Sequence, residues 1–95
     1  MFRISIVEGR AQRRLVLEGK LIAPWTTEVE RAWKSAADQL HGRKLVIDLR
    51  NVTLISVDGE NTLSQLMKDG ATFSCGDVLT KHLLRRLARR NRCGP

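Results

Sequence analysis

The chain has 95 residues, 42% of them hydrophobic, and a formal net charge of +7. A chain of this length buries roughly 60 to 70% of its unfolded surface, so we expect one domain over 1–95 and exclude a second. It contains no run of the roughly 20 apolar residues that a membrane span needs. The opening MFRISIVEGR is too short and too soon charged for a signal peptide, which predicts a cytoplasmic protein.

The positive charge is concentrated near the C-terminus. Residues 1–80 contain 11 Lys and Arg against all 10 Asp and Glu, whereas residues 81–95 contain six Lys and Arg and no acid. We expect a basic helix there, followed by a basic tail over 88–95. Three interpretations stay open: a solvated tail, a surface for an acidic protein, or a surface for nucleic acid or anionic lipid. The basic residues concerned are Lys81, Arg85, Arg86, Arg89 and Arg90.

Hydropathy patterns predict two strands and a helix in the first half of the chain. Residues 2–7 alternate as a half-buried strand does, and residues 13–21 resume the pattern after a turn, which indicates a hairpin or a paired edge. Within residues 23–42, apolar side chains recur every three or four positions, as in an amphipathic helix. Trp25 and Trp33 share that spacing, so we expect them in the core rather than in a ligand platform.

The second half repeats the alternation of strand and helix. The continuous apolar run KLVIDL (44–49) predicts a central strand covered on both faces, which RNVTLIS extends or bends at Asn51. A helix follows from Val57 to Lys68, ended by Asp69-Gly70, and then a strand over 71–75. The last predicted helix spans 76–90, with these residues facing inward: Val78, Leu79, Leu83, Leu84 and Leu87.

This order predicts an α/β fold: a mixed, mostly parallel four-stranded sheet with about three helices. In such sheets the loops after the carboxyl ends of the strands collect functional groups. We therefore expect 21–25, 55–60 and 75–78 to lie near one rim.

The element order and the stretch LVIDLRNVTLISVDGENTLSQLMKDGATFSC resemble the STAS domain of anti-sigma-factor antagonists and sulfate transporters, over about 15–87. The family pattern is vvlDLs.v.fiDSSGl..L followed by Ga.l.l. The matching residues are Val46, Ile47, Asp48, Leu49, Val52, Ile55, Gly59, Leu63, Gly70 and Ala71. The resemblance also implies that the usual last strand and helix are lacking, which leaves a homodimer through the open sheet edge as a hypothesis.

In the family, a kinase-like anti-sigma factor phosphorylates the first serine of DSSG and so breaks the complex. Alignment on Gly59 places Ser56 at the usual aspartate, Val57 at the phosphoacceptor and Asp58 at the second serine. Family members also often carry an acidic residue after the second strand, in the pattern G.LD, and here GKLI places Ile22 at that position. The resemblance therefore implies a docking surface that has lost its phosphoswitch.

We predict a partner-binding surface in the region 56–68, with a solvated face as the equal alternative. Ser56 is expected to cap the helix, in preference to accepting phosphate, and Asp58 to favour the helix dipole. The predicted partner-binding residues are Ser56, Val57, Asp58, Gly59, Glu60, Asn61, Ser64 and Lys68.

The predicted function is a non-enzymatic, bacterial interaction domain that takes part in transcription regulation. His41 and His82 have no spaced partners for a metal or nucleophile site, and the two cysteines have no metal spacing, so we expect no catalysis, cofactor or metal. The expected partner is a kinase-like anti-sigma factor. Two alternatives stay open: a regulatory subunit that braces the ATPase of an ABC-type lipid transporter, or a non-specific nucleic-acid-binding protein that uses the basic helix.

Overall fold

The computed structural model describes residues 2–93, with side chains described for 2–89. Its elements follow the predicted order. The strands are β1 (Arg3–Glu8), β2 (Gln12–Leu21), β3 (Lys44–Ile55) and β4 (Thr72–Ser74), and the helices are α1 (Trp25–Ala36), α2 (Val57–Lys68) and α3 (Val78–Cys93). Within the described range, no helix is both long and apolar enough to cross a membrane.

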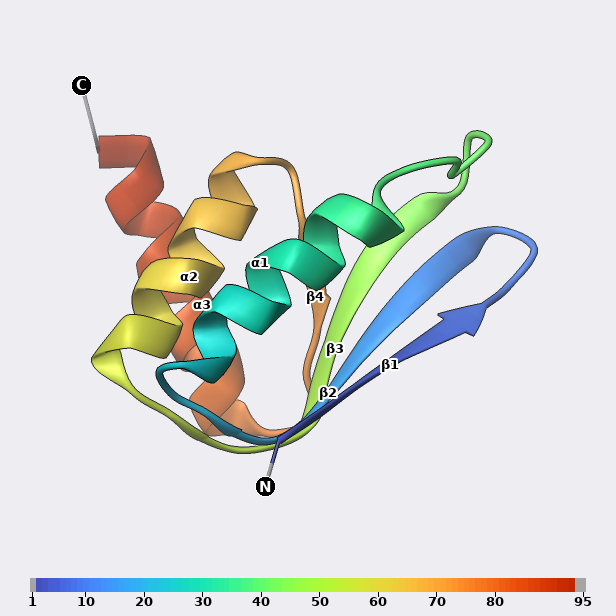
Figure 1. Cartoon of the computed structure of the whole chain (residues 1–95). Coiled ribbons are helices and arrows are strands. Elements are labelled where there is room, and N and C mark those ends of the chain that lie inside the picture. The colour runs from blue at the N-terminus through green and yellow to red at the C-terminus, as the bar shows by residue number, and fades with distance from the viewer. Residues whose placement is uncertain (1, 94–95) are drawn as a thin grey trace.

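The sheet has the strand order β1-β2-β3-β4. β1 pairs with β2 in antiparallel fashion, whereas β2–β3 and β3–β4 are parallel, as the sequence predicted. Crossovers between parallel strands are right-handed as a rule, so two crossovers that step in the same direction place their helices on one face. Figure 1 shows the helices gathered on one side of the sheet.

The core lies between the sheet and these helices. Its fully buried side chains come from alternate positions of β2 and β3 and from all three helices: Leu15, Leu17, Leu21, Val29, Ile47, Leu49, Leu63, Leu66 and Leu87. The period-2 pattern of β2 therefore buries one face, as half-buried strands do. The helices of the described chain lie on one side, yet Val46 and Asp48 on the other face of β3 are also buried, at 7% and 2% exposure, so this strand is covered on both faces as predicted.

Side chains of the strands themselves cover this second face. Asp48, which is 2% exposed, pairs with Arg50 at 2.9 Å and with Arg14 at 3.5 Å. Burial by itself raises the pKa of Asp48, but hydrogen bonds from Arg50 and the charges of both arginines hold this pKa below its usual value. The ion pairs allow a carboxylate to occupy the centre of the strand.

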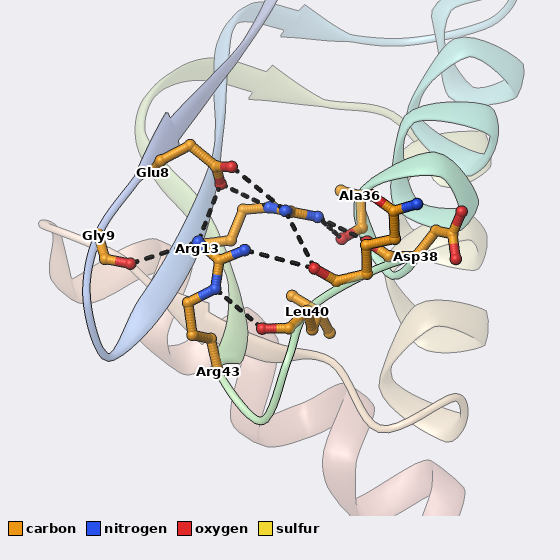
Figure 2. Close-up of polar contacts among 8 residues, drawn as sticks. Glu8, Gly9, Arg13, Ala36, Asp38, Leu40 and Arg43 are labelled. Carbon is orange, nitrogen blue, oxygen red and sulfur yellow. Dashed lines mark hydrogen bonds and ion pairs between the residues drawn. The ribbon is translucent and has the colours of Figure 1, made fainter.

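Helix α1 ends at Ala36, six residues before the predicted end at Gly42. Gln39 and His41 have positive φ angles, so the chain cannot continue as a helix there. Two arginines bind carbonyl groups at the end of α1 and in the loop that follows it: Arg13 of β2 donates to Ala36 O (2.7 Å) and Asp38 O (2.8 Å), and Arg43 donates to Leu40 O (2.8 Å). Figure 2 shows both guanidinium groups between Glu8 and this loop.

Three predicted core residues lie at the surface instead. Val78 and Leu79 at the start of α3 are 79% and 80% exposed, and Trp25 is 40% exposed. The Trp25 ring stacks on Phe2 at a centroid distance of 6.3 Å. The first turn of α3 therefore leaves its two apolar side chains exposed.

The Asp48 cluster predicts a specific loss of stability in acid. Because the pKa of Asp48 is lower in the folded than in the unfolded chain, the ionised carboxylate stabilises the fold above its unfolded pKa of about 3.9. This contribution disappears as the pH falls through the folded pKa. We expect Asp48→Asn to lower the urea midpoint at pH 7 and to flatten its dependence on pH between about 2 and 5.

Urea unfolding at several pH values tests this expectation. Arg50→Gln removes the shorter of the two ion pairs and should give an intermediate pH dependence. An Asp48→Asn variant with the wild-type profile would contradict the assignment.

Candidate partner-binding site at the rim of the sheet

The loops after β2 and β3 meet at one rim of the sheet. The Ser56 N–H donates a hydrogen bond of 3.1 Å to Leu21 O, which joins the last residue of β2 to the start of α2. β4 runs parallel to both strands, so its carboxyl end points to the same rim. Ile55 and Asp77 line one hollow there, which places the third predicted loop beside the second.

Ser56 is the N-cap of α2, as the sequence predicted. Its Oγ accepts a hydrogen bond from the Gly59 N–H (3.2 Å) and donates one to Leu21 O (3.3 Å). A capping oxygen satisfies an N–H group of the first turn that has no partner within the helix. Both functions of this hydroxyl, donor and acceptor, are thus engaged within the fold.

Gly59 allows α2 to lie close to the end of β2. A Cβ atom at this position would lie 2.5 Å from Leu21 O and 3.0 Å from Ile55 Cγ2. Any other residue would therefore push the helix away from the strand. Gly59 is itself buried, so it positions the candidate surface and does not form part of its exposed area.

The other predicted residues lie on the outward side of α2. Val57, which is 73% exposed, Asn61, Ser64 and Lys68 recur every three or four residues and form one stripe along the helix. The buried residues of α2 form the opposite side: Gly59, Thr62, Leu63 and Leu66. The structure thus brings the stripe together as one continuous surface, which we call the α2 face.

Two acids flank the α2 face at its N-terminal end. Asp58 and Glu60 both lie in the first turn, where a negative charge favours the helix dipole. Glu60 also pairs with Arg86 of α3 at 3.4 Å, so it connects the two helices. The α2 face therefore has an apolar and acidic start and a basic end at Lys68.

An apolar hollow beside this surface was missed by the sequence prediction. It has a volume of about 220 Å³ and lies between the end of β3 and the start of α3, with Leu54 and Leu79 among its lining residues. β4 pairs only with Val46–Asp48, so the outer edge of β3 beyond Asp48 lies next to α3 rather than next to a strand. The exposure of Leu54 (51%) follows from this short pairing and from irregular pairing of β2 with β3.

The predicted basic residues occupy α3. Lys81, Arg85, Arg86 and Arg89 lie on this helix, and a hollow of about 200 Å³ is lined by His82, Arg85, Arg86 and Arg89. The side chain of Arg90 lies outside the described residues, as does that of Cys93. The α2 and α3 surfaces adjoin through the Glu60–Arg86 pair.

In the described part of the chain, the side chains that could bind a metal ion are dispersed. This part contains no cluster of three or more His, Cys, Asp and Glu side chains that could hold a metal ion. The carboxyl groups whose pKa is displaced, Glu8 and Asp48, are both paired with arginines: the Arg13 hydrogen bond lowers the pKa of Glu8 despite some desolvation. These shifts follow from ion pairs that hold strands and loops together.

Comparison with known proteins finds solved structures of similar fold. The sequence matches no family model and no curated protein. Among solved structures, an antisigma-factor antagonist STAS domain from Rhodobacter sphaeroides has a TM-score of 0.55 at 17% identity, with 78% of this chain and 84% of that chain covered. A structure described as a crystal structure analysis of Mglu has a TM-score of 0.59 at 19% identity; the match covers 77% of this chain and only 19% of that one. The fold is STAS-like.

The cap at Ser56 yields a stability prediction. Ser56→Ala removes the hydroxyl that bonds the Gly59 N–H and Leu21 O, so we expect a loss of about 1 kcal/mol in the free energy of unfolding. Ser56→Thr keeps a hydroxyl and should retain most of this stability. Urea unfolding of the two variants measures the difference.

The matched control is Ser35→Ala, at an exposed position of α1, which should change stability by less than about 0.5 kcal/mol. Equal losses in Ser56→Ala and Ser35→Ala would disprove the capping role.

Proposed function

We propose that this protein is a non-enzymatic interaction module that binds another protein through the α2 face and the loop before it. The observation that favours this role most is Val57, a large apolar side chain that is 73% exposed at the start of a helix. Exposed apolar residues beside polar ones mark interaction sites when they adjoin others. The same rim exposes Leu54, Val78 and Leu79.

The proposed docking does not depend on phosphorylation within the loop. Val57 has no hydroxyl, and Ser56 uses its hydroxyl as a donor to Leu21 O and as an acceptor from the Gly59 N–H. A phosphate on Ser56 would remove the proton that bonds Leu21 O and would place negative charge near that carbonyl oxygen. The surface is therefore proposed to be permanently competent for binding.

The partner is proposed to be a protein of the kind that STAS domains bind, a kinase-like anti-sigma factor. The likeness to an antisigma-factor antagonist domain supports this choice at the level of the fold. The composition of the α2 face also indicates what the partner surface should provide. We expect an apolar contact for Val57 and hydrogen-bonding groups for Asn61 and the nearby acids. Transcription regulation is then the process in which the protein takes part.

Affinity capture from the cell of origin tests the proposal. Val57→Glu with Asn61→Arg replaces two neighbours on the α2 face, and both side chains are exposed, so the fold should be preserved. We expect wild type to retain a distinct protein partner and the double variant to lose it by tenfold or more, about 1.4 kcal/mol in binding free energy. Quantitative mass spectrometry of the retained proteins is the measurement.

Thr27→Glu with Ser35→Arg on α1 is the matched control, because it makes the same kinds of substitution at exposed positions. This control should retain the partner at the wild-type level. If all three proteins retain the same set, the α2 face is not the docking surface.

A further inference from the structure

Helix α3 presents a dense group of basic side chains on one part of its surface. Lys81, Arg85 and Arg89 follow one another at intervals of four residues, and Arg86 lies beside them. All four are exposed, and Arg85, Arg86 and Arg89 line the hollow of about 200 Å³ together with His82. We call this group the α3 basic face.

The stability of α3 does not account for these charges. A cation favours the C-terminal end of a helix, whereas Lys81 is the fourth residue of α3, near its positive end. Like charges four residues apart also repel each other, and this applies to Lys81–Arg85 and Arg85–Arg89. The basic face therefore opposes the intrinsic stability of its own helix.

The fold neutralises little of this charge. In the described part of the chain, Glu60 is the one acid that pairs with the basic face, through Arg86 at 3.4 Å. Among these described side chains, Lys81, Arg85 and Arg89 have no acidic partner. Three unpaired cations on about two turns of helix form a strongly positive surface.

The charge of the hollow on the α3 basic face distinguishes between possible ligands. Protein interfaces have apolar centres from which charged residues are depleted, whereas nucleic-acid interfaces are polar and strongly basic. The lining of this hollow is entirely basic or imidazole, while the apolar hollow lies elsewhere, between β3 and α3. Residues 78–93 contain no Phe, Trp or Tyr side chain on which an unpaired base could stack, and His82 supplies the one imidazole ring.

We propose that the α3 basic face binds the phosphate backbone of double-stranded nucleic acid, without sequence selectivity. A planar guanidinium group can donate two parallel hydrogen bonds to the oxygens of one phosphate, and Arg85 and Arg89 are both available for such contacts. This role goes beyond the protein docking proposed for the α2 face and uses different residues. The two proposals can therefore fail separately.

Binding of a labelled 20-bp DNA duplex, measured by fluorescence anisotropy at several salt concentrations, tests the inference. With three to five phosphate contacts, wild type should lose affinity roughly 50- to 500-fold between 50 and 200 mM NaCl. Arg85→Gln with Arg89→Gln should weaken binding about tenfold or more at 50 mM and reduce the salt slope by about 2. Arg86 is left unchanged because it pairs with Glu60.

Two further variants separate a local site from general charge. Lys20→Gln with Lys34→Gln removes the same number of charges from exposed positions on β2 and α1, and it should change the affinity less than twofold. Arg85→Lys with Arg89→Lys keeps the charge and should retain most of the binding. Circular dichroism of each variant shows that the fold is intact.

Three outcomes would overturn the inference. The first is no salt-dependent binding by wild type, and the second is an equal loss in the Lys20 and Lys34 control. The third is displacement of the duplex by a 20-residue polyglutamate peptide at an equal concentration of charge, which would instead identify an acidic protein as the ligand.

Discussion

The carbonyl oxygen of Leu21 holds the rim together. It accepts hydrogen bonds from the Ser56 N–H and from Ser56 Oγ, and Gly59 lies so close to it that a Cβ atom would approach to 2.5 Å. These contacts join the end of β2, the end of β3 and the first turn of α2 into one junction. The direction of α2, and hence the placement of Val57 and Asn61, depends on this junction. A glycine at position 59 is thus a geometric requirement of the fold.

Charge serves two different purposes in this molecule. Asp48 and Glu8 are held by arginines that also tie strands or loops together, and the low pKa of each carboxyl group follows from those contacts. Among the described side chains, the cations of the α3 basic face have only Glu60 as an acidic partner. Charges that the fold neutralises contribute to its architecture, whereas charges that it leaves unpaired determine what the surface attracts.

Much of the fold could be predicted from the sequence because its elements have clear periods. The bounds of α2, Val57–Lys68, follow from a switch of period and from Asp69-Gly70, and the cap follows from the chemistry of Ser56. The end of α1 at Ala36 could not be predicted, since it depends on Arg13, which is distant in sequence. The exposure of Leu79 could not be predicted for a similar reason. Helical spacing shows which residues of α3 form an apolar stripe, but it does not show that β4 is too short to cover the start of that stripe.

A valine at position 57 changes what the rim can do. A serine there is uncharged, or carries about −1.5 to −2 charge when it is phosphorylated, so a partner can be released by adding charge. Valine offers one state only. Its exposed surface gains roughly 25 cal/mol for each Å² that a partner removes from water, and it has no counterpart of the phosphate that would oppose contact. If the α2 face binds as proposed, its occupancy depends on the concentration and state of the partner, and any regulation acts through groups outside the loop, such as the neighbouring basic helix.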